Sequence, residues 1–236
     1  MNIWTELART STAAGDEIIL RRRNELYEIR YNGVELMCNS SHQSEDVLAA
    51  KALRLLDRPA RRILIGGLGL GFTLRMALNY LDDDAEVTVS EIIPEIVDWN
   101  RRYLGHLADH PLDDARVLIR VEDVMETLKH ARERYDVVLM DTDNGPDHTG
   151  RTPNGQIYEG CGIGAVKQSL SPDGIAAFWS ATLSPEFEGR LDAAQWHWRC
   201  DSVSLPGRRV DAFHYIYLAS RDAARVNQLV RRDLAA

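Results

Sequence analysis

Between residues 61 and 180, short apolar runs alternate with segments whose apolar positions recur at helical spacing. The pattern predicts strands at 63–65, 86–90, 117–121, 137–140 and 175–180. It predicts helices at 72–80, 94–103, 124–131 and 157–170, with a turn over 172–174 before the last strand. Strands that alternate with helices in this way indicate a parallel, doubly wound α/β sheet.

The two ends of the chain follow other patterns. Residues 17–39 contain β-prone runs, and Asn32-Gly33 between two of them predicts a tight hairpin turn. A helix is expected at 44–56, ended by Arg58-Pro59. Near the C-terminus, strands 197–205 and 212–219 predict an antiparallel hairpin across Pro206-Gly207, followed by an amphipathic helix over 221–234. We therefore expect a small β unit over residues 1–43 and an α/β domain over 44–236.

The first strand of the alternation runs into glycines at every second position, Gly67, Gly69 and Gly71, just before a helix begins. Glycines let the backbone turn sharply and approach a ligand closely, and a helix N-terminus offers free N–H groups. The dinucleotide fingerprint needs glycines two and five residues after the first. Phe72 and Leu74 occupy the last of these positions, so NAD(P) is not expected. The spacing looks like the nucleoside loop of class I S-adenosylmethionine-binding folds, although a purely structural glycine turn would show the same pattern.

Three acidic residues follow successive predicted strands. Ligands of open α/β sheets bind beyond the carboxyl ends of the strands. Glu91 lies about twenty residues after the glycine loop, where a carboxylate can accept both ribose hydroxyls. Asp123 could accept a hydrogen bond from an adenine amine, or could cap the helix that follows it. Asp141 ends the strand at 137–140. Together they predict the nucleoside-binding edge of the domain over 44–236.

Composition bounds the compartment and the partners. The 236 residues fit one substantial domain with a small addition, and no apolar run approaches the roughly 18 residues of a membrane span. There is no signal-peptide core, and Cys38, Cys161 and Cys200 lie far apart. We expect a cytoplasmic protein with no metal and no disulfide framework. The net charge of −8 disfavours nucleic acid and suits a cationic small substrate, or simply solubility.

The order and spacing of several sequence blocks resemble the polyamine synthase family, the spermidine and spermine synthases with their shorter bacterial relatives. The blocks are residues 26–37, 64–67, 89–94, 122–124 and 135–141. The resemblance implies a small N-terminal β unit followed by a Rossmann-like, nucleoside-binding catalytic domain. It also implies a transferase of polyamine biosynthesis, which moves an aminopropyl group from decarboxylated S-adenosylmethionine to a small-molecule amine. A homodimer is one possible assembly.

The resemblance also implies roles for individual residues. Gly67 and Gly69 would belong to the donor loop, Glu91 would hold the ribose, and Asp123 the adenine. Asp141 would orient and deprotonate the attacking amine, because an alkylammonium must lose a proton before it can attack.

Other residues are candidates for the acceptor side. Glu45 and Asp143 would add negative charge near Asp141. Tyr158 could line the acceptor cavity, although a tyrosine on a helix is also a common core residue.

Three positions differ from the family pattern. The family carries an Asp near Gly69 that holds the donor's aminopropyl amine. Its helix-opening Tyr-His-Glu corresponds to Gln43-Ser44-Glu45, and its Asp-x-x-Asp-Pro to the segment 141–146. Loss of the Asp near Gly69 favours the full S-adenosylmethionine donor, so a small-molecule methyltransferase is the second hypothesis. A nucleoside-binding subunit without catalysis is the third.

Overall fold

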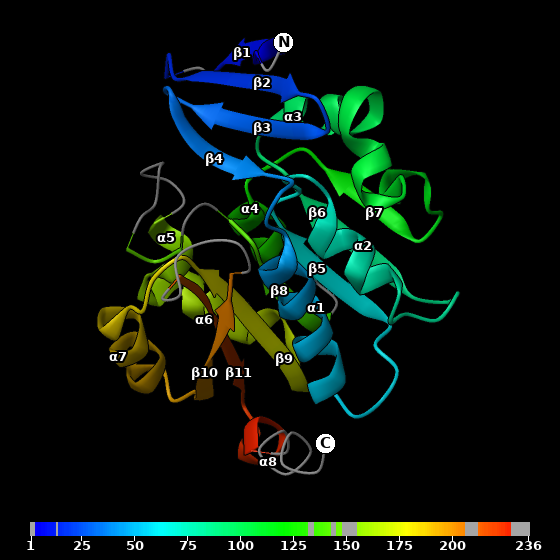
Figure 1. Cartoon of the computed structure of the whole chain (residues 1–236). Helices are drawn as coiled ribbons and strands as arrows, with labels where there is room; N and C mark the ends of the chain where they lie inside the picture. Colours follow the sequence, from blue (N-terminus) through cyan, green and yellow to red (C-terminus); the bar gives the residue numbers. More distant parts are fainter. Residues whose placement is uncertain are drawn as a thin grey trace.

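The computed structural model describes residues 3–12, 14–131, 135–142, 145–147, 155–205 and 212–227. These ranges form a four-stranded and a seven-stranded sheet (Figure 1). The small sheet is antiparallel and consists of β1 (Thr5–Ser11), β2 (Glu17–Arg23), β3 (Leu26–Tyr31) and β4 (Val34–Cys38). Asn32 and Gly33 both have positive φ, 47° and 77°, as a two-residue hairpin turn requires, so the predicted turn is confirmed. Strand β1 was not predicted, because none of its residues is fully buried and its sequence has no apolar face.

The large sheet has the order β10-β11-β9-β8-β5-β6-β7. Its strands are β5 (Arg62–Gly66), β6 (Glu86–Ser90), β7 (Val117–Arg120), β8 (Tyr135–Met140), β9 (Leu170–Ser180), β10 (His197–Ser204) and β11 (Phe213–Ser220). The first five are mutually parallel, and β10 and β11 form an antiparallel hairpin beside β9. This confirms the predicted doubly wound sheet with its C-terminal hairpin. The order reverses between β5 and β8, which places the carboxyl ends of these two strands at the topological switch point.

Alternate residues of the central strands point to opposite faces of the large sheet. On one face, Ile63 and Ile65 pack with α1 (Gln43–Leu55), α2 (Phe72–Leu78) and α3 (Pro94–Trp99). On the other face, Leu64 packs with α4 (Val124–Lys129), α5 (Gly155–Tyr158), α6 (Gly160–Ser169) and α7 (Pro185–Ala193). The remaining helical segments are a π-helical turn (Asn100–Leu104), two 3₁₀ turns (Gly105–Ala108 and Pro111–Asp113) and α8 (Ala223–Asn227).

The small sheet does not have a separate core. Ile18, Leu20 and Ile29 are fully buried and belong to the apolar cluster that also contains α1 and α2. In Figure 1 this sheet lies over the end of the large sheet at which β5 meets α2. Burial of these side chains therefore fixes β3 and β4 against the switch point.

The structure departs from the sequence-based expectation at three further places. The helix expected at 157–170 is broken at Glu159, whose extended backbone separates α5 from α6. The predicted turn at 172–174 lies within β9, where pairing to β8 jumps from Leu170 to Ile175. Helix α7 was missed, although the Ser184 hydroxyl caps it by accepting from the Phe187 N–H at 3.3 Å. Pro206-Gly207 and residues 228–234 of the expected last helix lie outside the described residues.

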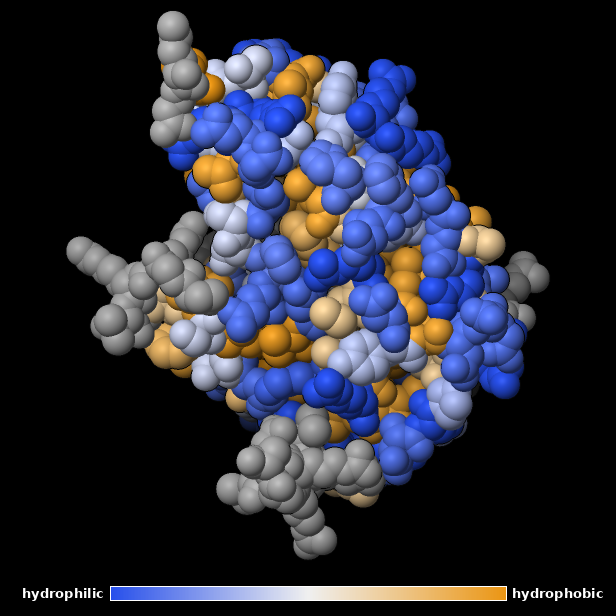
Figure 2. All heavy atoms as spheres, turned by 45° about the vertical axis from the view of Figure 1, so that its right-hand side comes forward, coloured by the Kyte–Doolittle hydropathy of each residue, from blue (hydrophilic) through white to orange (hydrophobic). Residues whose placement is uncertain are grey.

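On the face shown in Figure 2, hydrophobic residues form separate patches among hydrophilic ones. Scattered exposed apolar side chains such as Val34 and Val121 are ordinary for a folded domain. None of the helices in the described ranges is long and apolar enough to cross a membrane.

Candidate active site

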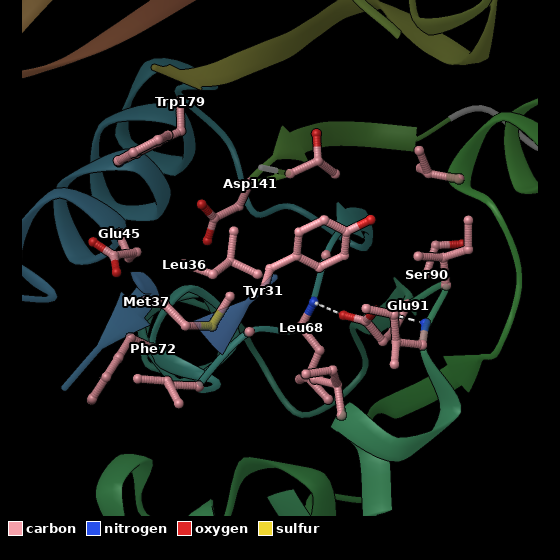
Figure 3. Close-up of a pocket in the computed structure, with 18 of the residues that line it drawn as sticks. Tyr31, Leu36, Met37, Glu45, Leu68, Phe72, Ser90, Glu91, Asp141 and Trp179 are labelled. Atoms are coloured by element: carbon pink, nitrogen blue, oxygen red, sulfur yellow. Dashed lines mark hydrogen bonds between the residues drawn. The ribbon is translucent and has the colours of Figure 1, made fainter. Parts of the chain in front are cut away.

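A cavity of about 350 Å³ lies at the switch point, beyond the carboxyl ends of β5, β6 and β8. The glycine loop forms its floor, and residues 35–38 of β4 in the small sheet form a second wall. Figure 3 shows Glu45 and Asp141 on one side of this cavity and Ser90 and Glu91 on the other. The cavity therefore has two separate polar ends.

The glycine loop is held in a backbone conformation that other residues rarely adopt. Gly67 has φ of 90°, and a Cβ atom there would lie 2.3 Å from the carbonyl oxygen of Asp141. Its N–H donates to the carbonyl of Ser90 at 2.8 Å. Gly69 has φ of 52°, and its carbonyl accepts from the side-chain amide of Asn100 at 2.8 Å. Glycine is thus required sterically at position 67, and the buried Asn100, which the sequence did not single out, anchors the loop.

Glu91 is oriented by two backbone groups. Its Oε2 accepts from the Leu68 N–H at 3.0 Å, and its Oε1 accepts from the Ile93 N–H at 2.9 Å (Figure 3). Glu91 as a whole residue is 7% exposed, and it lines the cavity. Each carboxylate oxygen has a second acceptor site, so these two bonds position Glu91 without saturating it.

Asp123 caps α4, as one of its two interpretations predicted. Its Oδ1 accepts from the Met125 N–H at 2.8 Å. Asp123 also lines the cavity, as does its neighbour Glu122, whose Oε1 accepts from the Thr127 hydroxyl at 2.7 Å. Capping uses one oxygen of Asp123, so the cap and a ligand contact are compatible.

Glu45 and Asp141 form a like-charged pair at the other end of the cavity. The Oδ2 of Asp141 accepts from the Thr73 hydroxyl at 2.6 Å, and the Oε2 of Glu45 accepts from the Ser44 hydroxyl at 2.6 Å. Burial raises the pKa of Asp141 to about 6, against the opposing effect of the Thr73 hydrogen bond. Burial, together with the charge of Asp141, raises the pKa of Glu45 to about 7. A cation between these carboxylates would relieve their repulsion.

Two further residues were predicted for the acceptor side, Tyr158 and Asp143. Tyr158 is fully buried and is not part of the cavity lining. Its hydroxyl donates to the carbonyl of Thr142 at 3.0 Å and lies 3.1 Å from the Thr142 hydroxyl. Because Thr142 lines the cavity, Tyr158 supports the cavity wall through this residue, and its contact with an acceptor stays a prediction. Asp143 lies outside the described residues.

The structure adds cavity residues that no local sequence signal marked. Trp179, the next-to-last residue of β9, belongs to the apolar core and also lines the cavity. His214 of β11 lines the cavity beside it, with its ring edge-on to Trp179 at 4.6 Å between centroids. Met37 of β4 also contributes, and its sulfur would lie 3.3 Å from a Cβ atom at Gly69. These residues come from segments far apart in the sequence, so only the tertiary structure brings them together.

The cavity is strongly acidic. Among its described lining residues, the carboxylates are Glu35, Glu45, Glu91, Glu122, Asp123 and Asp141. No lysine or arginine belongs to that lining. Within the described ranges, no group of three or more His, Cys, Asp or Glu side chains is arranged to hold a metal ion. The electrostatics of the lining therefore favour a cationic ligand.

The sheet order and the glycine loop at its switch point define a class I S-adenosylmethionine-binding fold. The chain belongs to the spermine/spermidine synthase family, because the model of the spermine/spermidine synthase domain matches residues 45–188.

Two relatives agree with that membership, and a solved structure shares the fold. The chain is 31% identical over 153 residues to polyamine aminopropyltransferase 1 of Hyperthermus butylicus, covering 63% of this chain and 51% of the relative. It is 31% identical over 146 residues to the polyamine aminopropyltransferase of Moorella thermoacetica, covering 62% and 48%. The chain thus spans about half the length of these relatives. The crystal structure of spermidine synthase from Thermotoga maritima superposes with a TM-score of 0.74 at 18% identity, covering 94% of this chain and 74% of that one.

Proposed function

We propose that this protein is an aminopropyltransferase of polyamine synthesis, with decarboxylated S-adenosylmethionine as donor and a small amine as acceptor. Family membership supports the reaction class, and Glu91 and Asp123 are the residues we assign to the ribose and the adenine. We assign Asp141 as the proton acceptor and Glu45 as its partner in binding the amine.

The observation that carries the proposal is the charge of the cavity. Six carboxylates line it, and its described lining has no lysine or arginine. Decarboxylated S-adenosylmethionine and an alkylammonium acceptor are both cations, so each replaces repulsion between carboxylates by attraction. Full S-adenosylmethionine also carries a carboxylate, which would enter this acidic cavity without an opposing charge. The cavity therefore favours aminopropyl transfer over methyl transfer.

The reaction requires one displacement. The acceptor ammonium first gives a proton to Asp141, and the nitrogen lone pair then attacks the aminopropyl carbon bonded to sulfur. A C–N bond forms as the C–S bond breaks, and the bonding electrons stay on sulfur. The product, 5′-methylthioadenosine, is a neutral thioether, so departure needs no acid. Alignment of the two reactants in one cavity would supply much of the acceleration.

Loss of the family's Asp near Gly69 leaves the donor ammonium to other groups. The thioether of Met37 faces Gly69 and cannot pair with a cation as a carboxylate does. We propose that the negative charges of Asp141 and Glu45 attract the donor ammonium. The same two carboxylates also bind the acceptor ammonium. This crowding of two ammonium groups predicts weaker donor binding than a site with an additional carboxylate would give.

The test is transfer by the purified protein from decarboxylated S-adenosylmethionine to a panel of mono-, di- and polyamines. We expect 5′-methylthioadenosine and an aminopropylated amine by mass spectrometry, and no S-adenosylhomocysteine when full S-adenosylmethionine is supplied. Thermal stabilisation by each nucleoside provides a binding measurement that does not depend on turnover. Methyl transfer without aminopropyl transfer would establish the methyltransferase alternative. Nucleoside binding without either reaction would indicate a non-catalytic subunit.

A further inference from the structure

Glu45 is linked through one buried hydroxyl to His214 of β11, a second residue of the cavity lining. Ser44 is completely buried in the first turn of α1, and its Oγ lies 2.6 Å from Glu45 Oε2. The same Oγ lies 2.8 Å from Nδ1 of His214, 170 residues later in the chain. The His214 ring also packs edge-on against the indole of Trp179. His214, Ser44 and Glu45 thus form one chain of hydrogen bonds, which ends on the proposed amine-binding carboxylate.

The hydroxyl can donate only one proton, and two groups compete for it. When Glu45 is ionised, its carboxylate is a stronger acceptor than a neutral imidazole nitrogen. Ser44 then donates to Glu45, and its oxygen can only accept from His214. His214 must consequently carry its proton on Nδ1. In the opposite tautomer, the unprotonated Nδ1 would accept the hydrogen bond from the Ser44 hydroxyl. Glu45 would then lose this donor.

We propose that His214 is a positioning residue for the acceptor amine, which acts through Ser44 to hold Glu45 ionised and in place. The inference rests on the proposed function for its kinetic consequence but not for the direction of the hydrogen bonds. A hydrogen bond donated to a carboxylate favours its charged form, which is the form that binds an ammonium. A Ser44 hydroxyl that always donates to Glu45 also restricts the rotamer of the Glu45 side chain. Amine binding then does not have to bear this loss of side-chain entropy.

Direct evidence on the tautomer comes from nitrogen-15 NMR of histidine-labelled wild-type protein at pH 8. The chain has 7 histidines, and the signal lost in His214→Asn identifies the one of interest. We expect His214 protonated on Nδ1 and unprotonated on Nε2. Protonation on Nε2 alone would reverse the chain of hydrogen bonds and overturn the proposal.

Kinetics supply the second readout. His214→Leu and Ser44→Ala should each raise KM for the amine about tenfold, equivalent to about 1.4 kcal/mol, while kcat changes less than about threefold. His214→Asn should recover most of the loss, because its side-chain amide can donate from nearly the position of Nδ1. The double variant, with both Ser44→Ala and His214→Leu, should have the same KM for the amine as Ser44→Ala alone. Both changes break the same chain of hydrogen bonds, so their effects should not add.

The matched control is His197→Leu, on strand β10 of the same hairpin, where His197 is exposed and lies outside the cavity lining. It should leave KM unchanged. A normal KM in folded His214→Leu, or no recovery in His214→Asn, would refute the positioning role. If the wild-type protein transfers no aminopropyl group, the proposed function fails, and the tautomer alone decides the inference.

Discussion

Asp136 lies near the start of strand β8, and Asp141 directly follows its end. Substitution by Asn should change the stability of the protein in opposite directions at these two positions. Asp136 is buried, which alone would raise its pKa. Hydrogen bonds from Arg58 at 2.6 Å and from the backbone N–H groups of Arg61 and Arg62 lower its pKa overall. Asp141, just after the strand, has a pKa raised by burial to about 6. One carboxylate is therefore stabilised by folding, and the other is destabilised.

The magnitude for Asp141→Asn follows from linkage. The folded protein retains the Asp141 proton to about pH 6, whereas the unfolded chain loses it near 3.8, so wild-type stability falls as the pH rises between these values. The difference of about two pKa units corresponds to a cost of about 3 kcal/mol at pH 8 and roughly half of that at pH 5. Asn avoids this cost and can still accept from the Thr73 hydroxyl. We expect the variant to be more stable than wild type, by more at pH 8 than at pH 5.

The same variant should lose activity. Removal of a positioned proton acceptor typically lowers turnover by about 10²-fold or more, while nucleoside binding should change little. A gain in stability with a loss of turnover would show that Asp141 serves catalysis and lowers the stability of the folded protein.

Urea unfolding monitored by circular dichroism at pH 5 and pH 8 measures the stability change, with Asp136→Asn as control. Asp136 has a lowered pKa, so its contribution is complete above about pH 4 and is lost only as the pH falls further. Its Asn variant should lose about 1–3 kcal/mol equally at both pH values, because a buried charged hydrogen-bond network is broken. If Asp141→Asn is destabilised at pH 8, or its gain does not depend on pH, the reasoning about burial is refuted. Equal turnover in wild type and Asp141→Asn would remove the catalytic assignment.

Three further predictions concern the ligands. Glu91→Ala should weaken 5′-methylthioadenosine binding by about 1.5–3 kcal/mol in calorimetry, and should also lower stability because two backbone N–H groups lose their acceptor; unchanged affinity in a folded variant would exclude Glu91 from the site. Neither NAD nor NADP should bind at micromolar concentration, since Phe72 is buried where the fingerprint needs glycine, and saturable binding would contradict this. KM for the amine should fall as the pH rises from 5.5 to 7.5, because Glu45 and Asp141, with pKa values raised to about 7 and about 6, become ionised; a flat profile would argue against amine binding by this pair.

The cavity residues that could be predicted share one property, which is that strand topology alone determines where they go. Glu91, Asp123 and Asp141 each follow a parallel strand, and parallel strands of one sheet end at the same edge. Gly67 directly follows β5, at the start of the loop that leads into α2 at the switch point. For such positions, an apolar run of strand length and the identity of the residues after it are sufficient to predict that those residues lie at the cavity. The acceptor side has no such rule, because His214 and Ser44 come from segments 170 residues apart and no strand order brings them together.

By itself, the sequence determined the alternation of strands and helices, the hairpin at Asn32-Gly33, the class of the glycine loop and the acids of the switch point. These depend on periodicity, turn chemistry and the direction of the strands, which are local properties of the chain. The tertiary structure alone decided that β4 forms a wall of the cavity, that Asn100 anchors the glycine loop, and that His214 reaches Ser44. Each of these depends on how separate elements pack. Packing is decided by the burial of many side chains at once, and no short segment of sequence records it.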